Sequence, residues 1–354
     1  MSESPAGVIR KRPGMYIGDT RDGSGLAHLV WEVVANAVDE HLAGACQQIS
    51  VEIGADGAVT VEDDGRGFPL RLASGAPFAE VALTKFHATP TLDGHAPHAH
   101  VGKYGVGLVV VCALSERLEL HVYRDGRSGQ QRFARGIATS GVEDHGPSDR
   151  TGTRLTFLPD PTIFSGRALD TSLVLERLTE LSFLLPGLTI QFADRRVRVL
   201  HQPGGLAGHL EAVATDSRIG STFRLTEVVD DVEVDIAARW GLHRNTSVQS
   251  FANTERTTDG GTHVKGLLAG LSEGLKQAAP QLAQLAPKPR LSAVSRNLSA
   301  LVCVRLMDPD YDRPTKSRLT TPRVERIVKT VVARHFARFL GEEPELLAVL
   351  KAPP

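Results

Sequence analysis

A glycine-rich turn at residues 102–107 places the strongest constraint on the fold of this chain. Its pattern is Gly-x-x-Gly-x-Gly, and its last glycine opens the apolar stretch GLVVVCAL. Bare backbone amides at the start of a helix suit phosphate. The turn has neither the Lys-Ser/Thr ending of a P-loop nor the flanking parallel βαβ pattern of a dinucleotide fold. The sequence therefore predicts a phosphate site and disfavours both common nucleotide-binding folds.

A row of polar side chains lies on an otherwise apolar predicted helix. Residues 26–43 read as one helix that ends before Gly44. Glu32 and Asn36 are four residues apart and share one face, and Asp39 lies on the same stripe. An unpartnered buried carboxylate is costly, so the row is either a satisfied structural network or the wall of a site that holds a cation or polarises water. Spacing alone favours the structural interpretation.

The segment EDDGRGFP, residues 62–69, follows a predicted hairpin that turns at Asp56-Gly57. Asp63 at the strand end can accept a hydrogen bond from an amino group such as that of adenine. Glycines at alternate positions let the backbone approach a ligand closely. Because DDG is also a common turn, this segment alone indicates a nucleotide site only weakly.

Composition indicates a folded protein with ordinary cores. The formal net charge is -1, and no apolar run approaches the roughly 20 residues of a membrane span. The three cysteines lie in apolar runs without the spacing of a metal site, so we expect buried thiols in the cytoplasm and no membrane contact. Residues 70–100 are expected to form a mobile loop or lid crossed by one short helix, and we assign no metal to the histidines there.

Pro and Gly cluster at HQPGG, where we place a domain boundary near residue 203. The chain is expected to form two domains, residues 1–203 and 204–341. The remaining residues, 342–354, end in AlaProPro and are expected to fray.

The order of an acid-amide helix, Asp-x-Gly-x-Gly and Gly-x-x-Gly-x-Gly resembles the GHKL family of ATP-binding proteins. Six segments look like the DNA gyrase B subunit and its topoisomerase IV counterpart: RKRPGMYIGDT, EVVANAVDE, EDDGRGFP, TGT, RLTELSFL and DGGTH. The resemblance runs from about residue 8 to about residue 340. It implies an α+β fold, in which a GHKL α/β sandwich that binds ATP is followed by a transducer domain of the ribosomal-S5-like type.

The resemblance also implies roles for single residues. Glu32 matches the general base that activates the water attacking the γ-phosphate, and Asn36 matches the ligand to Mg²⁺. Asp63 matches the adenine-binding carboxylate, with Thr153 beside it. Lys316 matches the lysine of the second domain that reaches the γ-phosphate. Pro69 and Met15 would help wall the base pocket, and Arg66 and Glu40 would form a supporting pair at its mouth. The other implied ATP-binding residues are Gly67, Gly102, Lys103, Tyr104, Gly105, Val106 and Gly107.

Three features depart from the family pattern. The phosphate turn loses one glycine and a histidine but gains the cation of Lys103, and the family's Gln-Thr-Lys becomes Pro314-Thr315-Lys316. We therefore predict slow turnover. Only seven residues precede Val8, a shorter arm than the family's, which argues against the ATP-dependent homodimer that such an arm closes.

The chain contains no Toprim-type metal motif and no tyrosine-bearing cleavage domain, so by itself it is not expected to cleave DNA. Residues 313–338 hold eight Lys or Arg against Glu325 alone, a net +7, while the rest of the chain sums to -8. This basic tract is either a DNA-facing surface or a solvated helix face. We expect an ATP-operated clamp or switch whose partner is DNA or a topoisomerase A-type subunit. The alternative is a nucleotide-dependent module recruited to resistance, defence or biosynthesis through another protein.

Overall fold

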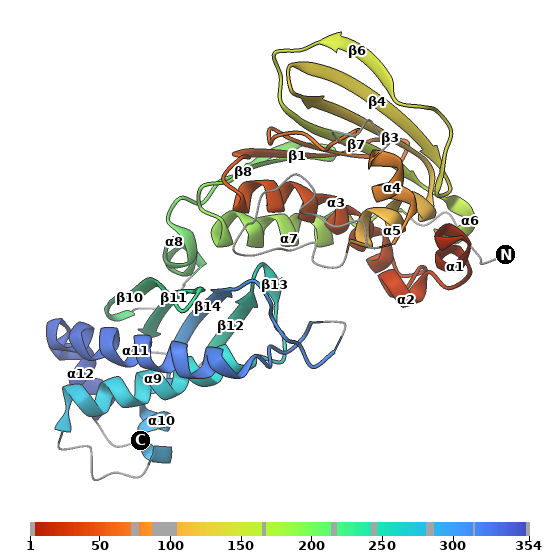
Figure 1. Ribbon diagram of the computed structural model, residues 1–354. Coiled ribbons are helices and arrows are strands. Elements are labelled where there is room, and N and C mark those ends of the chain that lie inside the picture. Colours follow the sequence, from red (N-terminus) through yellow and green to blue (C-terminus); the bar gives the residue numbers. More distant parts are fainter. Residues whose placement is uncertain are drawn as a thin grey trace. The chain divides into compact units, whose positions relative to one another are not determined.

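The computed structural model describes residues 4–71, 78–86, 105–164, 168–213, 218–241, 246–280, 287–313 and 316–351. The chain divides into two compact units, residues 1–201 and 202–354. The division falls two residues before the boundary that the Pro and Gly cluster indicates. Each unit combines one sheet with helices, as expected for an α+β fold (Figure 1).

The first unit is built on one mixed sheet whose strands run in the order β5-β4-β3-β7-β2-β1-β8-β9, with β6 paired to β4. Its strands are β1 Gln48–Ile53, β2 Val59–Asp63, β3 Ser115–Arg124, β4 Arg127–Ala134, β5 Ile137–Ala138, β6 Glu143–Pro147, β7 Gly152–Pro159, β8 Thr189–Ala193 and β9 Val197–Leu200. The expected hairpin forms between β1 and β2, and Gly57 in its turn has φ +83°. Alternate side chains of these two strands are buried against the helices.

Helices cover one face of this sheet, with α3, α5 and α7 lying together (Figure 1). The helices of the first unit are α1 Pro5–Lys11, α2 Gly14–Ile17, α3 Ser24–Leu42, α4 Phe78–Thr84, α5 Gly107–Leu114, α6 Pro161–Phe164 and α7 Thr171–Leu184. The long helix predicted at 26–43 is α3, and α5 is the apolar helix that follows the glycine-rich turn. The lid expected at 70–100 lies largely outside the described residues, apart from α4 and its neighbours.

The second unit has a five-stranded sheet in the order β10-β11-β14-β12-β13. Its elements are α8 Gly205–Val213, β10 Arg218–Val229, β11 Val232–Gly241, β12 Ser247–Ala252, β13 Glu255–Arg256, α9 Thr262–Ala278, α10 Pro287–Ser295, β14 Leu298–Arg305, α11 Pro322–Glu342 and α12 Pro344–Lys351. Helices α9 and α11 pack together on one face of the sheet, and α8 packs on β11 and β14 (Figure 1). The glycines at 266, 270 and 274 let α9 approach α11 closely, because a Cβ at each would meet α11 atoms at 2.7 to 2.9 Å.

The expectation of a frayed tail after residue 341 is wrong for residues 344–351. These residues form α12, and Leu346 and Leu350 are buried in the core of the second unit. Burial of two leucines one turn apart offsets the entropy that the chain end loses on ordering. The strand β10 was also not predicted, although Phe223 and Leu225 point to the core with the period of two that marks a strand.

Candidate functional site

Helix α3 carries a polar stripe on one face and core residues on the other. Glu32, Asn36 and Glu40 follow one another at intervals of four residues, while nine other residues of the helix are buried. The stripe faces the ends of β2 and α5 rather than solvent, because Asn36 lines a pocket with Asp63 and Glu32 lies against Gly107. The structure thus favours a site wall over the purely structural network that spacing alone suggested.

Glu32 sits between two neighbours that fix its position. The Nε2 atom of His28, one turn earlier on α3, lies 3.0 Å from a carboxylate oxygen of Glu32, whose side chain is 25% exposed. On the other side, the carboxylate lies so close to Gly107 that a methyl group there would overlap it. A carboxylate that is held in place yet reachable by solvent is suited to taking a proton from water.

Asp63 ends strand β2 and forms the polar floor of the site. One carboxylate oxygen accepts a hydrogen bond from the backbone of Gly65 at 2.9 Å. Burial raises the pKa of Asp63 to about 7, the negative charge of Glu40 adds to the rise, and backbone hydrogen bonds from Gly65 and Thr153 oppose it. A carboxyl group that titrates near neutrality in a pocket is typical of a binding or catalytic position.

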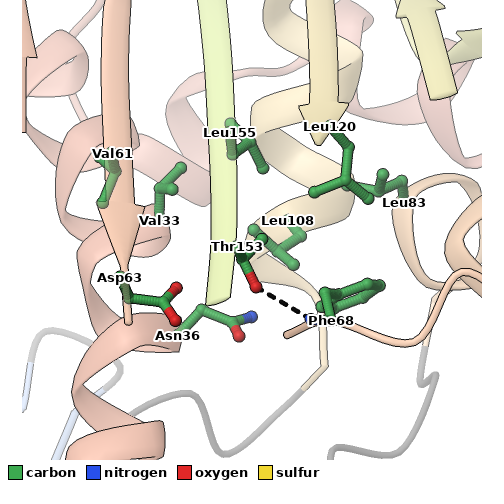
Figure 2. Close-up of a pocket in the computed structure, with 10 residues that line it drawn as sticks. All are labelled: Val33, Asn36, Val61, Asp63, Phe68, Leu83, Leu108, Leu120, Thr153 and Leu155. Carbon is green, nitrogen blue, oxygen red and sulfur yellow. Dashed lines mark hydrogen bonds between the residues drawn. The ribbon is translucent and has the colours of Figure 1, made fainter. Parts of the chain in front are cut away.

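A small pocket opens beside Asp63. Figure 2 shows polar groups at one end and aliphatic side chains at the other. Its lining residues are Val33, Asn36, Val61, Asp63, Phe68, Leu83, Leu108, Leu120, Thr153 and Leu155. The Thr153 hydroxyl oxygen accepts a hydrogen bond from the backbone N–H of Phe68 at 2.9 Å, so it holds the segment after β2 against β7 (Figure 2). Apolar walls with an acceptor at one end match the chemistry of a flat heteroaromatic ring that carries an amino group.

The turn after Asp63 is fixed by an ion pair and by a close backbone approach. Arg66 donates from Nε at 3.0 Å and from a terminal nitrogen at 2.7 Å to the two carboxylate oxygens of Glu40. The backbone N–H of Arg66 adds a third bond to Glu40 at 3.1 Å. Gly67 has φ +86°, and a Cβ there would overlap the carbonyl oxygen of Tyr123. The supporting pair expected between Arg66 and Glu40 is therefore present.

The glycine-rich turn is described only in its second half. Gly105 has φ +58°, and Gly107 begins α5, next to Glu32. Gly102, Lys103 and Tyr104 lie outside the described residues. A phosphate group bound at the start of α5 would lie near Glu32, since Gly107 and that carboxylate are in contact.

Buried interactions hold the far end of α5. Arg10 of α1 donates to the carbonyl oxygen of Ala113 at 2.9 Å and to the carboxylate of Asp160 at 2.8 Å. The Nε atom of Arg135 donates to the same Asp160 oxygen at 2.8 Å, and the backbone N–H of Asp160 donates to the carbonyl of Leu114. The segment RKRPG thus anchors the helix that carries the phosphate turn.

Two sequence expectations for the base pocket differ from the structure. Met15 is 73% exposed and does not line the pocket among the described residues. Phe68, and not Pro69, supplies the ring at the pocket wall, and it stacks on Phe78 of α4 with ring centroids 5.5 Å apart. His28 was not predicted as part of the site, although its spacing of four residues before Glu32 signals a contact on the helix face.

Lys316 belongs to the second unit. Its ammonium group donates to a carboxylate oxygen of Glu255 at 3.3 Å. Pro314 and Thr315 lie outside the described residues.

The three cysteines are free and buried, as expected.

The donor set at the pocket suits a magnesium ion that comes with a nucleotide. No group of three His, Cys, Asp or Glu that could hold a metal occurs in the described part of the chain. Mg²⁺, however, often takes only one or two protein oxygens and completes its shell with phosphates and water. The amide oxygen of Asn36, on the same helix face as Glu32, is such a donor.

The chain matches two family models and several solved structures of known proteins. A model described as DNA gyrase B matches residues 205–351, and one described as histidine kinase-, DNA gyrase B- and HSP90-like ATPase matches residues 21–163. The crystal structure of the 43K ATPase domain of Thermus thermophilus gyrase B, in complex with an aminocoumarin, is 33% identical with a TM-score of 0.83. It covers 97% of this chain, and this chain covers 92% of it. The chain belongs to the DNA gyrase B family.

Other gyrase B relatives agree with this membership. The gyrase B protein of Myxococcus xanthus has a TM-score of 0.83 at 28% identity, with 98% of this chain and 99% of that chain covered. The gyrase B protein of Halalkalibacterium halodurans is 36% identical over 96% of this chain and 55% of its own length. The chain thus spans about half the length of the curated gyrase B relatives it matches. The predicted GHKL and transducer folds are confirmed, and the chain is a gyrase-B-type ATPase module.

Within the described helices, none is long and apolar enough to span a bilayer.

Proposed function

We propose that this chain binds ATP in the pocket beside Asp63 and hydrolyses it with Glu32 as the general base. The observation that carries the proposal is the contact between Glu32 and Gly107, since it brings a held carboxylate to the start of the helix that follows the phosphate turn. Adenine would occupy the slot with its amino group donating to Asp63. The triphosphate would then extend toward α5 and Glu32.

The residues around Glu32 have separate tasks in this proposal. Glu32 orients a water molecule in line with the γ-phosphate and accepts its proton, while His28 holds the carboxylate from the other side. Asn36 would hold magnesium, which when bound neutralises phosphate charge. Backbone amides at residues 102–107 and the Lys103 cation would hold the phosphates. Lys316 from the second unit would contact the γ-phosphate and so make domain movement depend on ATP.

We further propose that ATP operates the chain as a clamp whose partner is DNA or a topoisomerase A-type subunit. The support is the basic tract of residues 313–338, much of which lies on α11 with Arg323, Lys329 and Arg338 exposed. Part of the tract is paired within the unit, because Arg334 donates to Glu227 at 2.5 Å and Arg326 lies 3.8 Å from Asp230. A modest, salt-sensitive contact to DNA phosphates is therefore expected.

Steady-state release of phosphate from Mg-ATP, with and without duplex DNA, tests the proposal. Turnover that rises when duplex DNA is added, and loses the rise as salt is increased, supports both the ATPase and the clamp. Turnover that is indifferent to DNA at low salt contradicts the DNA partner but keeps the ATPase. Absence of both nucleotide binding and turnover contradicts the proposal as a whole.

Nucleotide affinity is expected to depend on pH through Asp63. The pKa of about 7 means that the free protein carries mostly protonated Asp63 at pH 6 and mostly ionised Asp63 at pH 8. Because the ionised carboxylate is the better acceptor for the adenine amino group, ADP should bind about tenfold more weakly at pH 6 than at pH 8. Calorimetric titration with Mg-ADP across this range measures the effect.

The matched variant for this measurement is Asp63→Asn, which keeps an oxygen acceptor and cannot titrate. It should bind ADP more weakly than wild type at pH 8. Its affinity for ADP should also lack the part of the pH dependence that comes from titration of Asp63. Protonation of the nucleotide itself affects both proteins equally. If the affinity for ADP changes equally with pH in wild type and in Asp63→Asn, Asp63 does not titrate between pH 6 and pH 8.

A further inference from the structure

Lys316 is carried by a loop whose base is fixed. Tyr311 and Leu319 form an antiparallel bridge, and the backbone N–H of Asp312 donates to the carbonyl of Arg318 at 3.2 Å. The Ser317 hydroxyl donates to a carboxylate oxygen of Asp259 at 2.8 Å. The loop that presents Lys316 is therefore tied to its own base and to the DGGTH segment.

The opposite side of the contact is equally well defined. Glu255 lies in the short strand β13, where it pairs with Ala252 of β12. The turn between them contains Asn253, at φ +54°, whose side chain donates to the carbonyl of Leu306 at 3.0 Å and accepts from its N–H at 2.9 Å. These buried bonds fix the hairpin that places Glu255 beside the Lys316 loop.

The ion pair between Lys316 and Glu255 lies partly out of water, with side chains 26% and 19% exposed. Lys316 also has φ +55°, a left-handed conformation that a residue other than glycine adopts at some cost. The surrounding bonds therefore hold Lys316 in a strained position from which its ammonium group reaches Glu255. Because Lys316 is proposed to contact the γ-phosphate, this position corresponds to a state in which the lysine is not bound to phosphate.

We propose that Glu255 is a positioning residue that holds the Lys316 ammonium inside the second unit until a triphosphate competes for it. The inference rests on the proposed contact between Lys316 and the γ-phosphate. A carboxylate and a phosphate that approach the same ammonium group repel each other, so the γ-phosphate competes with Glu255 for Lys316. The γ-phosphate carries more negative charge than one carboxylate and can win the exchange.

This exchange has a specific consequence for nucleotide selection. Breaking the pair with Glu255 opposes binding of ATP, whereas ADP has no γ-phosphate and leaves the pair intact. Glu255 therefore lowers the affinity for triphosphate without changing the affinity for diphosphate. Glu255 thus sets the concentration of ATP at which Lys316 is released to bind the γ-phosphate.

The test compares binding of the non-hydrolysable β,γ-imido analogue of ATP with binding of ADP, both with magnesium. Glu255→Gln removes the charge and keeps the shape, and it should tighten binding of the analogue about three- to fivefold, as expected for loss of a partly exposed ion pair. Affinity for ADP should stay the same. Glu273→Gln is the matched control, because it removes a carboxylate 3.6 Å from Lys276 on α9 without touching Lys316. Glu255→Asp, which shortens the reach, should give a smaller change in the same direction.

Lys316→Ala separates the two proposals. If it leaves the ratio of analogue to ADP affinity unchanged, the proposed role of Lys316 is wrong and the holding role of Glu255 falls with it. If it lowers that ratio but Glu255→Gln and Glu255→Asp behave like Glu273→Gln, only the holding role is overturned. In the double variant Lys316→Ala/Glu255→Gln, the gain from Glu255→Gln should vanish, because the two effects share one contact.

Discussion

Replacing Glu32 with alanine is expected to lower the turnover number for ATP by about 10²- to 10⁴-fold, the range that general-base catalysis contributes. Its carboxylate contacts His28 and lies against Gly107 at the start of α5. The affinity for the ATP analogue should stay within about threefold of wild type, because the base acts mainly in the transition state. Single-turnover phosphate release together with equilibrium binding measures both quantities.

Two further variants sharpen this prediction. Glu32→Gln keeps size and hydrogen bonding but cannot accept a proton, so it should be nearly as slow as Glu32→Ala. Glu52→Ala removes an exposed carboxylate from β1, away from the pocket, and should turn over like wild type. Turnover by Glu32→Gln at the wild-type rate would exclude proton transfer to Glu32 and leave it at most an electrostatic role.

The parts of the site that sequence could predict are those set by short spacing. The interval of four residues places Glu32 and Asn36 on one helix face, and the strand-end pattern around Asp63 puts its carboxylate at the edge of the sheet. The contact between Arg66 and Glu40 spans 26 residues, and only resemblance to the family indicated it. The two residues come together in the fold because the end of β2 lies beside α3.

Other contacts left little local signal. Lys316 and Glu255 are 61 residues apart and come together through the pairing of β12 with β14, a long-range register that no window of sequence contains. The order of the tail arises in the same way, since Leu346 is buried only because β10 and α11 form a core for it. His28 is different, because its spacing from Glu32 is a local signal, although the apolar character of the surrounding helix obscures it.

A large effect on stability is expected at Asp160, whose side chain is 0% exposed and which binds both Arg10 and Arg135. Its other carboxylate oxygen accepts from the backbone N–H of Thr162 at 3.0 Å and from its hydroxyl at 2.7 Å. Asp160→Ala removes all these bonds and leaves Arg10 and Arg135 without their shared carboxylate. The free energy of unfolding should fall by about 3 kcal/mol, the lower part of the range for a broken buried ion pair, because the arginines are partly exposed.

The matched control is Glu143→Ala, which breaks the two-point contact between Glu143 and Arg132 on the surface of the same sheet. Because both side chains are well exposed, the loss should stay under about 1 kcal/mol. Urea unfolding of the first unit can be followed by Trp31 fluorescence in a Trp240→Phe background, since the chain has two tryptophans. Equal losses for the two variants would show that the buried network contributes little net stability.

The contribution of Asp160 should also depend on pH in a defined direction. Burial alone raises the pKa of Asp160, but hydrogen bonds from Arg135, Thr162 and Arg10 outweigh it and hold the pKa below its usual range. A folded-state pKa below the unfolded value of about 4 means that the stabilisation is complete at neutral pH and is lost as pH falls below that value. The difference between wild type and Asp160→Ala should therefore be constant from pH 8 to about pH 5 and shrink as the medium becomes more acidic. Because Arg10 also binds the end of α5, the same acid range should loosen the helix that carries the phosphate turn, and analogue affinity should fall with it.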